Sequence, residues 1–167
     1  SLSYRIAGLI DEYKASQGDI ADDAPGKVKM QPIQEYAIES SIAKVYCSEA
    51  LNRIVSECLQ MYGGYGYVED YPAEMGFRDA RINMIFEGTN EVNRLLIPGM
   101  LLKRAMKGEL PLMQWMAQLE AGPQAKPEGR FATEMDAVHR FKGIAGLLLQ
   151  QVATKFMQTL DQEQELL

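Results

Sequence analysis

Histidine and cysteine are scarce in this sequence, which has one histidine, His139, and two cysteines, Cys47 and Cys58. A single histidine excludes a multi-histidine metal site, and the two cysteines are too far apart for a CxxC redox motif. Both cysteines fall within a helical pattern, so we expect buried thiols that act as small hydrophobic groups. The sequence therefore predicts no metal site and favours a reducing compartment.

A basic excess and a long apolar run are also absent. The formal net charge is −6, and no basic tract interleaved with aromatic residues offsets it, which argues against a nucleic-acid-binding surface. No apolar run is long enough to span a bilayer, and no signal peptide opens the chain. With 167 residues, 47% of them hydrophobic and 24% charged, the chain suits one globular domain with its own core.

Apolar residues recur at helical spacing along most of the chain. They predict a first helix over residues 1–16, and the pattern starts so abruptly that we expect this helix to continue a longer one. A loop is expected over residues 17–29, which are rich in glycine, aspartate and proline. Pro32 suits the first turn of the next helix, over about residues 31–61, whose apolar stripe is wide enough to be packed on two sides. Gly63 should end that helix, because a positive φ is needed there.

The second half of the chain also has helical patterns. Pro72 is placed to open a short helix behind Asp70. Another helix starts from Gly88 onward, with Gly88 or Thr89 as its cap, and Pro98 should kink it. Beyond it we expect a short helix, a linker and a final long helix, over residues 108–120, 121–130 and 131–167. Since no strand and no internal repeat is evident, the sequence predicts an all-α fold.

The densest stretch is YGGYGYVEDYPAEMGFRDARINMIFEGTNEVNRLLIPG, residues 62–99. One interpretation treats Glu87 and Glu91 as exposed carboxylates beside a glycine turn, as most carboxylates are. The other notes that Ile85 and Phe86 would make an apolar approach to Glu87, and desolvation would make its carboxylate a stronger base. Backbone N–H groups starting the next helix would then favour an anionic group, such as a phosphate or an enolate oxygen.

Two segments together resemble a known family. The sequence QMYGGYGY, followed by EDYPAEMGFRDARINMIFEGTNEVNRLLI, strongly resembles the C-terminal helical domain of acyl-CoA dehydrogenases, over roughly residues 1–100. The resemblance implies an up-down helical bundle, FAD as cofactor and an acyl-CoA thioester as substrate. In that family the glutamate of an IYEGT motif removes the α-proton of the thioester, while the β-hydrogen leaves as a hydride to the flavin.

The resemblance also implies roles for individual residues. Glu87 matches the catalytic base, and Gly88 and Phe86 match positions beside the acyl-CoA substrate. Phe86 stands where many family members have tyrosine, which removes a hydroxyl near the base. At the start of the last core helix, FAD contacts are implied for Thr89, Asn90 and Glu91. A second set would contact the flavin nucleotide of an adjacent subunit: Gln60, Met61, Tyr62, Gly63 and Gly64.

Family members are more than twice as long as this chain, with a helical domain and a β-domain before the matched region. We therefore expect a fragment that binds FAD weakly or not at all and is inactive without those domains. Residues 1–107 would belong to the C-terminal helical domain, and residues 108–167 would be a helical extension. The complete protein would form a homodimer or homotetramer and pass electrons to an electron-transfer flavoprotein, in the bacterial cytoplasm or the mitochondrial matrix.

The extension resembles that of the very-long-chain branch of the family. One broad face of its final helix is apolar, and we expect this face to pack on the bundle, with membrane contact as the less favoured alternative. The face comprises Met135, Val138, Phe141, Ile144, Leu148, Val152, Phe156 and Leu160. Met113, Trp115 and Met116 are expected to fill a core or an interface.

Three functions stay open at this point. The first is the dehydrogenase, the second an oxidase on the same scaffold, and the third a helical assembly module without catalysis. The sequence does not separate the first two and does not specify the acyl chain length. The presence of Glu87, flanked by Gly88 and Thr89, favours an enzyme over the assembly module.

Overall fold

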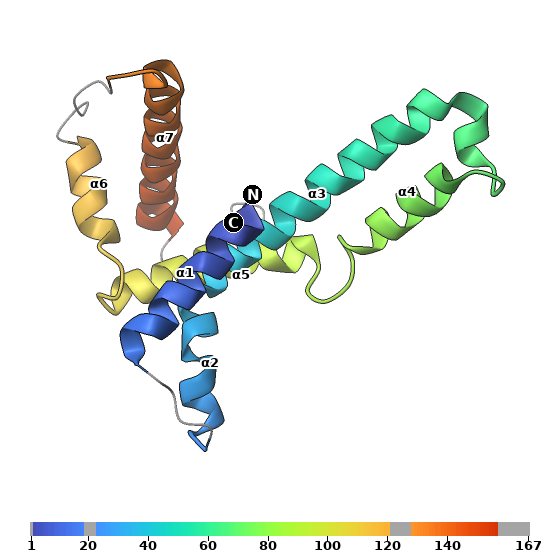
Figure 1. The fold of residues 1–167 in the computed structure, drawn as a ribbon. Coiled ribbons are helices and arrows are strands. Elements are labelled where there is room, and N and C mark those ends of the chain that lie inside the picture. The colour runs from blue at the N-terminus through green and yellow to red at the C-terminus, as the bar shows by residue number, and fades with distance from the viewer. Residues whose placement is uncertain (1, 19–22, 121–127, 157–167) are drawn as a thin grey trace. The chain divides into compact units, whose positions relative to one another are not determined.

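The computed structural model describes residues 2–18, 23–120 and 128–156, and within these ranges all regular structure is helical (Figure 1). The helices are α1 (Leu2–Gln17), α2 (Gly26–Glu35), α3 (Ala37–Tyr62), the short 3₁₀ helix η1 (Gly63–Tyr67), α4 (Pro72–Ile82), α5 (Asn90–Met106), α6 (Leu112–Glu120) and α7 (Ala132–Phe156). The all-α prediction is confirmed. The chain forms two compact units, residues 1–100 and 101–167, and the boundary between them falls within α5.

The segment before the long helix differs from the prediction. α2 begins at Gly26, so the loop is shorter than expected, and Pro32 lies inside α2 rather than in a first turn. Proline has no N–H for the helical hydrogen bond, and α2 ends at Glu35, soon after it. The chain leaves helical geometry at Tyr36 (φ −101°, ψ 25°), and Ser40 then donates to the Tyr36 carbonyl at 2.9 Å to begin α3. The single predicted helix is therefore two.

α3 and α4 form a helical hairpin. α3 ends where the sequence predicts, at Gly63, which has a φ of 59°. η1 brings Gly66 against α3 so closely that an added Cβ would lie 2.5 Å from a carbonyl oxygen of that helix. Pro72 opens α4 as predicted, but the residue before it is the extended Tyr71, and no side chain, that of Asp70 included, caps the helix. α4 then runs back along α3 (Figure 1).

Few apolar residues in the described part of the first unit are buried, and α3 keeps exposed apolar residues although α1, α2 and α4 all contact it. The buried apolar residues of this unit include Ile6, Ile38 and Ala80. α4 covers one side of α3, while Ile54 on α3 stays 65% exposed. Cys58 is half-buried and Cys47 is exposed, so the prediction of two buried thiols is wrong for Cys47, because a helical pattern does not specify which face of a helix its neighbours cover.

α6 and α7 pack side by side in the second unit (Figure 1). Met116 is buried there, as predicted, and Trp115 is half-buried, whereas the Met113 side chain lies outside the described part. Three residues of the apolar face of α7 stay largely exposed: Phe141 at 72%, Ile144 at 54% and Leu148 at 57%. Leu160 lies outside the described residues. Among the helices of the described ranges, none has the length and hydropathy of a membrane span.

Candidate active site

The segment between α4 and α5 carries the candidate base. The backbone N–H of Phe86 donates to the Ile82 carbonyl at 3.1 Å, which folds the chain back on the end of α4. The backbone N–H of Asn90 reaches the Met84 carbonyl at 3.0 Å. These bonds close a compact loop, hereafter the base loop (residues 83–89), which places Glu87 just before the start of α5.

Glu87 has an unusual backbone conformation. Its φ is 52°, and no other non-glycine residue in the described ranges has a positive φ. Left-handed geometry costs a residue with a Cβ roughly 1–2 kcal/mol, so it persists only where surrounding contacts hold it. Gly88 follows with a φ of 88°, and a Cβ at that position would lie 3.2 Å from the side-chain nitrogen Nδ2 of Asn93. The backbone itself therefore favours glycine at position 88.

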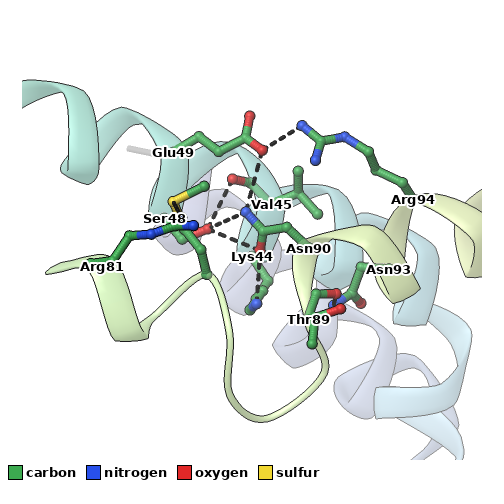
Figure 2. Close-up of polar contacts among 10 residues, drawn as sticks. Lys44, Val45, Ser48, Glu49, Arg81, Thr89, Asn90, Asn93 and Arg94 are labelled. Carbon is green, nitrogen blue, oxygen red and sulfur yellow. Dashed lines mark hydrogen bonds and ion pairs between the residues drawn. The ribbon is translucent and has the colours of Figure 1, made fainter.

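Asn90 is the most deeply buried polar residue of the described chain, with 0% of its surface exposed. Its Nδ2 donates to the Ser48 hydroxyl at 2.9 Å and to Glu49 Oε1 at 3.3 Å, and its Oδ1 accepts from Lys44 Nζ at 2.7 Å. Figure 2 shows the three α3 side chains gathered around this amide. Because its donors and its acceptor are bonded, the buried amide fastens the start of α5 to α3.

Lys44 extends this cluster to the base loop. Its ammonium donates to the Gly88 carbonyl at 2.6 Å as well as to Asn90 Oδ1. The Gly88 carbonyl also accepts from Asn93 Nδ2 at 2.8 Å, so both of its lone pairs are used. Charge-assisted hydrogen bonds are the stronger kind. One cation of α3 therefore holds both ends of the short segment from Gly88 to Asn90.

An ion pair continues the contact along α5. Arg94 pairs with Oε1 of Glu49, the same oxygen that accepts from Asn90 (Figure 2). The two side chains are 49% and 36% exposed, so solvent screens much of their attraction. The pair orients Glu49 toward Asn90 more than it stabilises the fold.

The N–H groups that begin α5 are already bonded within the chain. The Thr89 hydroxyl accepts from the Val92 N–H at 3.1 Å, which confirms Thr89 as the cap, and the Thr89 carbonyl accepts from the Asn93 N–H at 2.9 Å. The pKa of the Glu91 carboxyl lies below its usual range, mainly because the carboxylate accepts from its own backbone N–H, and also from the Thr89 hydroxyl. Since the Asn90 N–H is bonded too, the predicted anion site at this helix start is not supported.

Two further expectations about the base loop need correction. Glu87 is exposed, and its neighbours Ile85 and Phe86 are 50% and 45% exposed, so they do not enclose the carboxylate within this chain. Sequence neighbours on a loop cannot by themselves surround a side chain. The Asn90 side chain was expected to contact FAD, but it is buried and bonded to α3, so its role is to connect helices.

The second set of predicted flavin contacts lies at the other end of α3. At about 1.5 Å per residue, Gln60 is about 18 Å along the helix from Ser48, so one chain does not bring the two sets together. Apart from atoms of the adjoining backbone, no atom of the described residues lies within 4 Å of a Cβ added at Gly63 or Gly64, and Met61 is 81% exposed. The flavin contacts of this segment stay a prediction.

Lys44, Ser48 and Glu49 were not predicted to belong to the site. Lys44 and Ser48 lie one helical turn apart, which places both on one face of α3. This spacing was the available signal. In the described part of the chain, no group of three or more His, Cys, Asp or Glu side chains could hold a metal ion.

Known proteins similar to this chain agree on one family. The family described as "Acyl-CoA dehydrogenase, C-terminal domain" matches residues 21–102. A probable acyl-CoA dehydrogenase of Bacillus subtilis is 41% identical over 98% of this chain and 28% of its own length. A crystal structure of acyl-CoA dehydrogenase complexed with FAD from Bacillus anthracis is 39% identical, with a TM-score of 0.88 over 98% of this chain and 29% of that one.

A third relative shares only part of the matched region. The caffeyl-CoA reductase–Etf complex subunit CarC of Acetobacterium woodii is 47% identical over 40% of this chain and 17% of its own length. This chain thus spans less than a third of the length of the relatives it matches.

Proposed function

Because the chain belongs to the acyl-CoA dehydrogenase family, we propose that it forms the C-terminal part of an FAD-dependent enzyme that introduces a double bond between Cα and Cβ of a fatty acyl-CoA. Glu87 is the base that takes the α-proton. No side chain can accept a hydride, so the hydride from Cβ is assigned to FAD.

The backbone of Glu87 is the observation that carries this proposal. Its φ of 52° is maintained by a loop whose ends are bonded to α4 and to α3, and such outliers cluster at active sites. A general base must lie within hydrogen-bond reach of the proton that it removes, so a loop with a fixed conformation favours the reaction. Gly88, which has no side chain, leaves the thioester free to approach the base.

Two places on the chain would hold parts of FAD. One part would lie against Thr89 and Glu91 at the start of α5, and another against the exposed residues of the segment Gln60–Gly64. These places are separated along α3, which supports their serving two different flavins across a subunit contact. The complete enzyme would then be a homodimer or homotetramer.

The electrons would leave through an electron-transfer flavoprotein. The support is the relative named as a subunit of a caffeyl-CoA reductase–Etf complex. In an oxidase on the same scaffold, oxygen would be the acceptor instead, and each turnover would release hydrogen peroxide. Peroxide measured during aerobic turnover therefore distinguishes the two acceptors.

Replacement of the base tests the proposal. Glu87→Gln in the complete enzyme should keep FAD and bind acyl-CoA but lose nearly all flavin reduction, because the amide cannot accept the α-proton. Glu39→Gln, at an exposed position of α3, is the matched control and should reduce its flavin at the wild-type rate. Undiminished reduction by Glu87→Gln would refute the assignment of the base.

A further inference from the structure

We propose that Lys44 is a positioning residue for Glu87, and that its ammonium, anchored by Asn90, holds the base loop in the left-handed conformation from which the base acts. This inference rests on the proposed role of Glu87. It concerns a residue of α3 that lies 44 positions before Gly88 in the chain and donates a hydrogen bond to the backbone carbonyl of that loop residue.

The strained backbone needs a restraint from outside the loop. The carbonyl of Gly88, one residue after Glu87, accepts from Asn93 Nδ2 at 2.8 Å and from Lys44 Nζ at 2.6 Å. Asn93 lies in the first turn of α5, so it is local to the loop and moves with it. Lys44 belongs to a separate helix, so its bond ties the C-terminal end of the loop directly to α3, in addition to the bond from Phe86 to Ile82 at the end of α4.

The ammonium of Lys44 is itself held in place. It lies between the Gly88 carbonyl and Asn90 Oδ1, at 2.6 and 2.7 Å, and Asn90 is fully buried and bonded to Ser48 and Glu49 (Figure 2). Because Asn90 is itself held by other hydrogen bonds, it fixes where the Lys44 ammonium lies. The chain of contacts therefore runs from α3 through Lys44 to the carbonyl of Gly88, the residue that follows the base.

The chemistry of the side chain explains why lysine suits this position. An ammonium has three donors and no acceptor, so it can bond two carbonyl-type oxygens at once. Methionine has nearly the same length and no donor, so Lys44→Met would leave the Gly88 carbonyl with Asn93 alone. The base loop could then relax toward ordinary φ values and displace the Glu87 carboxylate.

The first test measures chemistry and binding separately in the complete enzyme. Lys44→Met should slow anaerobic flavin reduction by about 10- to 100-fold, the scale expected for a misplacement of about 1 Å, while acyl-CoA affinity changes by less than about threefold. Lys44→Gln, whose shorter amide cannot reach both oxygens, should behave alike and carries the test if Lys44→Met does not fold. Lys44→Arg should recover most of the rate, and Arg53→Met, an exposed cation of α3, should leave it unchanged. A wild-type rate in Lys44→Met or Lys44→Gln would overturn the proposal.

The second test asks whether Lys44 acts through Glu87. In a Glu87→Gln background, Lys44→Met should cause no further loss of the residual rate, because the group it positions is gone. A general structural role would lower the residual rate by the same factor as in the wild type, which would contradict the proposal.

A crystal structure of Lys44→Met provides a readout that does not depend on activity. The φ of Glu87 should leave the left-handed region, and an unchanged φ would overturn the inference. If Glu87→Gln instead proved fully active, the proposed function would fail, yet the structure would still report whether Lys44 holds the loop.

Discussion

Lys44 of α3 and Gly88 of the base loop are joined by a hydrogen bond of 2.6 Å across 44 positions of sequence. Together with the buried Asn90, this bond makes the loop that carries Glu87 part of the helical framework rather than a free surface turn. The Glu87 side chain is exposed within this chain, yet hydrogen bonds fix the backbone that carries it.

Asn90 should be a major determinant of stability. Asn90→Leu should lower the free energy of unfolding of the 167-residue chain by about 2–3 kcal/mol, because Lys44 and Ser48 lose a buried partner. Asn52→Leu is the matched control, since Asn52 Oδ1 is buried with no hydrogen-bond partner found in the described structure. Its replacement should leave stability unchanged or raise it. Urea unfolding followed by circular dichroism measures both, and equal losses would contradict a special role for Asn90.

Two glycines should respond in opposite directions to alanine. Gly88→Ala should destabilise the chain by about 1–2 kcal/mol, because alanine disfavours the positive φ and its Cβ would crowd Asn93. Gly99 lies inside α5, where an added Cβ would have open space among the described residues. Gly99→Ala should therefore raise the free energy of unfolding by about 0.5–1 kcal/mol. Thermal unfolding of the two variants makes the comparison. A harmless Gly88→Ala would show that the left-handed loop is not maintained in solution.

Much of the helical order was predictable from sequence, since Gly63 and Pro72 mark the end of α3 and the start of α4 by their own backbone chemistry. Pro32 was misplaced because a proline tolerated within a short helix looks the same in sequence as one in a first turn. The Glu87–Gly88 motif pointed to the base loop, but the contacts of Lys44 and Asn90 depend on how α5 packs on α3. Such long-range polar pairing leaves little trace in a local pattern.

The pKa of Glu91 predicts a pH dependence. Because the folded state lowers this pKa below its ordinary value of 4.5, the stabilisation is present above that value and is lost as the pH falls through the lower, folded-state pKa. Across that window the unfolded chain binds more protons, so stability rises with pH. Glu91→Gln should reduce the acid-side slope of unfolding free energy measured from about pH 3 to 6, and Thr89→Val should reduce it partly. An unchanged slope in Glu91→Gln would contradict the assigned hydrogen bonds.

The 167-residue chain by itself should not retain FAD. It carries two separated sets of proposed flavin contacts, and neither encloses a ligand within the first unit. The purified chain should therefore be colourless and strongly helical by circular dichroism. A stoichiometric flavin absorbance in the purified chain would show that residues 1–167 suffice to hold the cofactor.

The role of Glu87 is tested most directly by an anaerobic titration of the complete enzyme with saturated acyl-CoAs of graded chain length, following the oxidised flavin absorbance. One range of lengths should bleach the flavin of the wild type, whereas Glu87→Gln, with its flavin intact, should not be bleached by any of them. A wild-type flavin that no acyl-CoA reduces, or a Glu87→Gln flavin that is reduced at the wild-type rate, would contradict the proposed dehydrogenase.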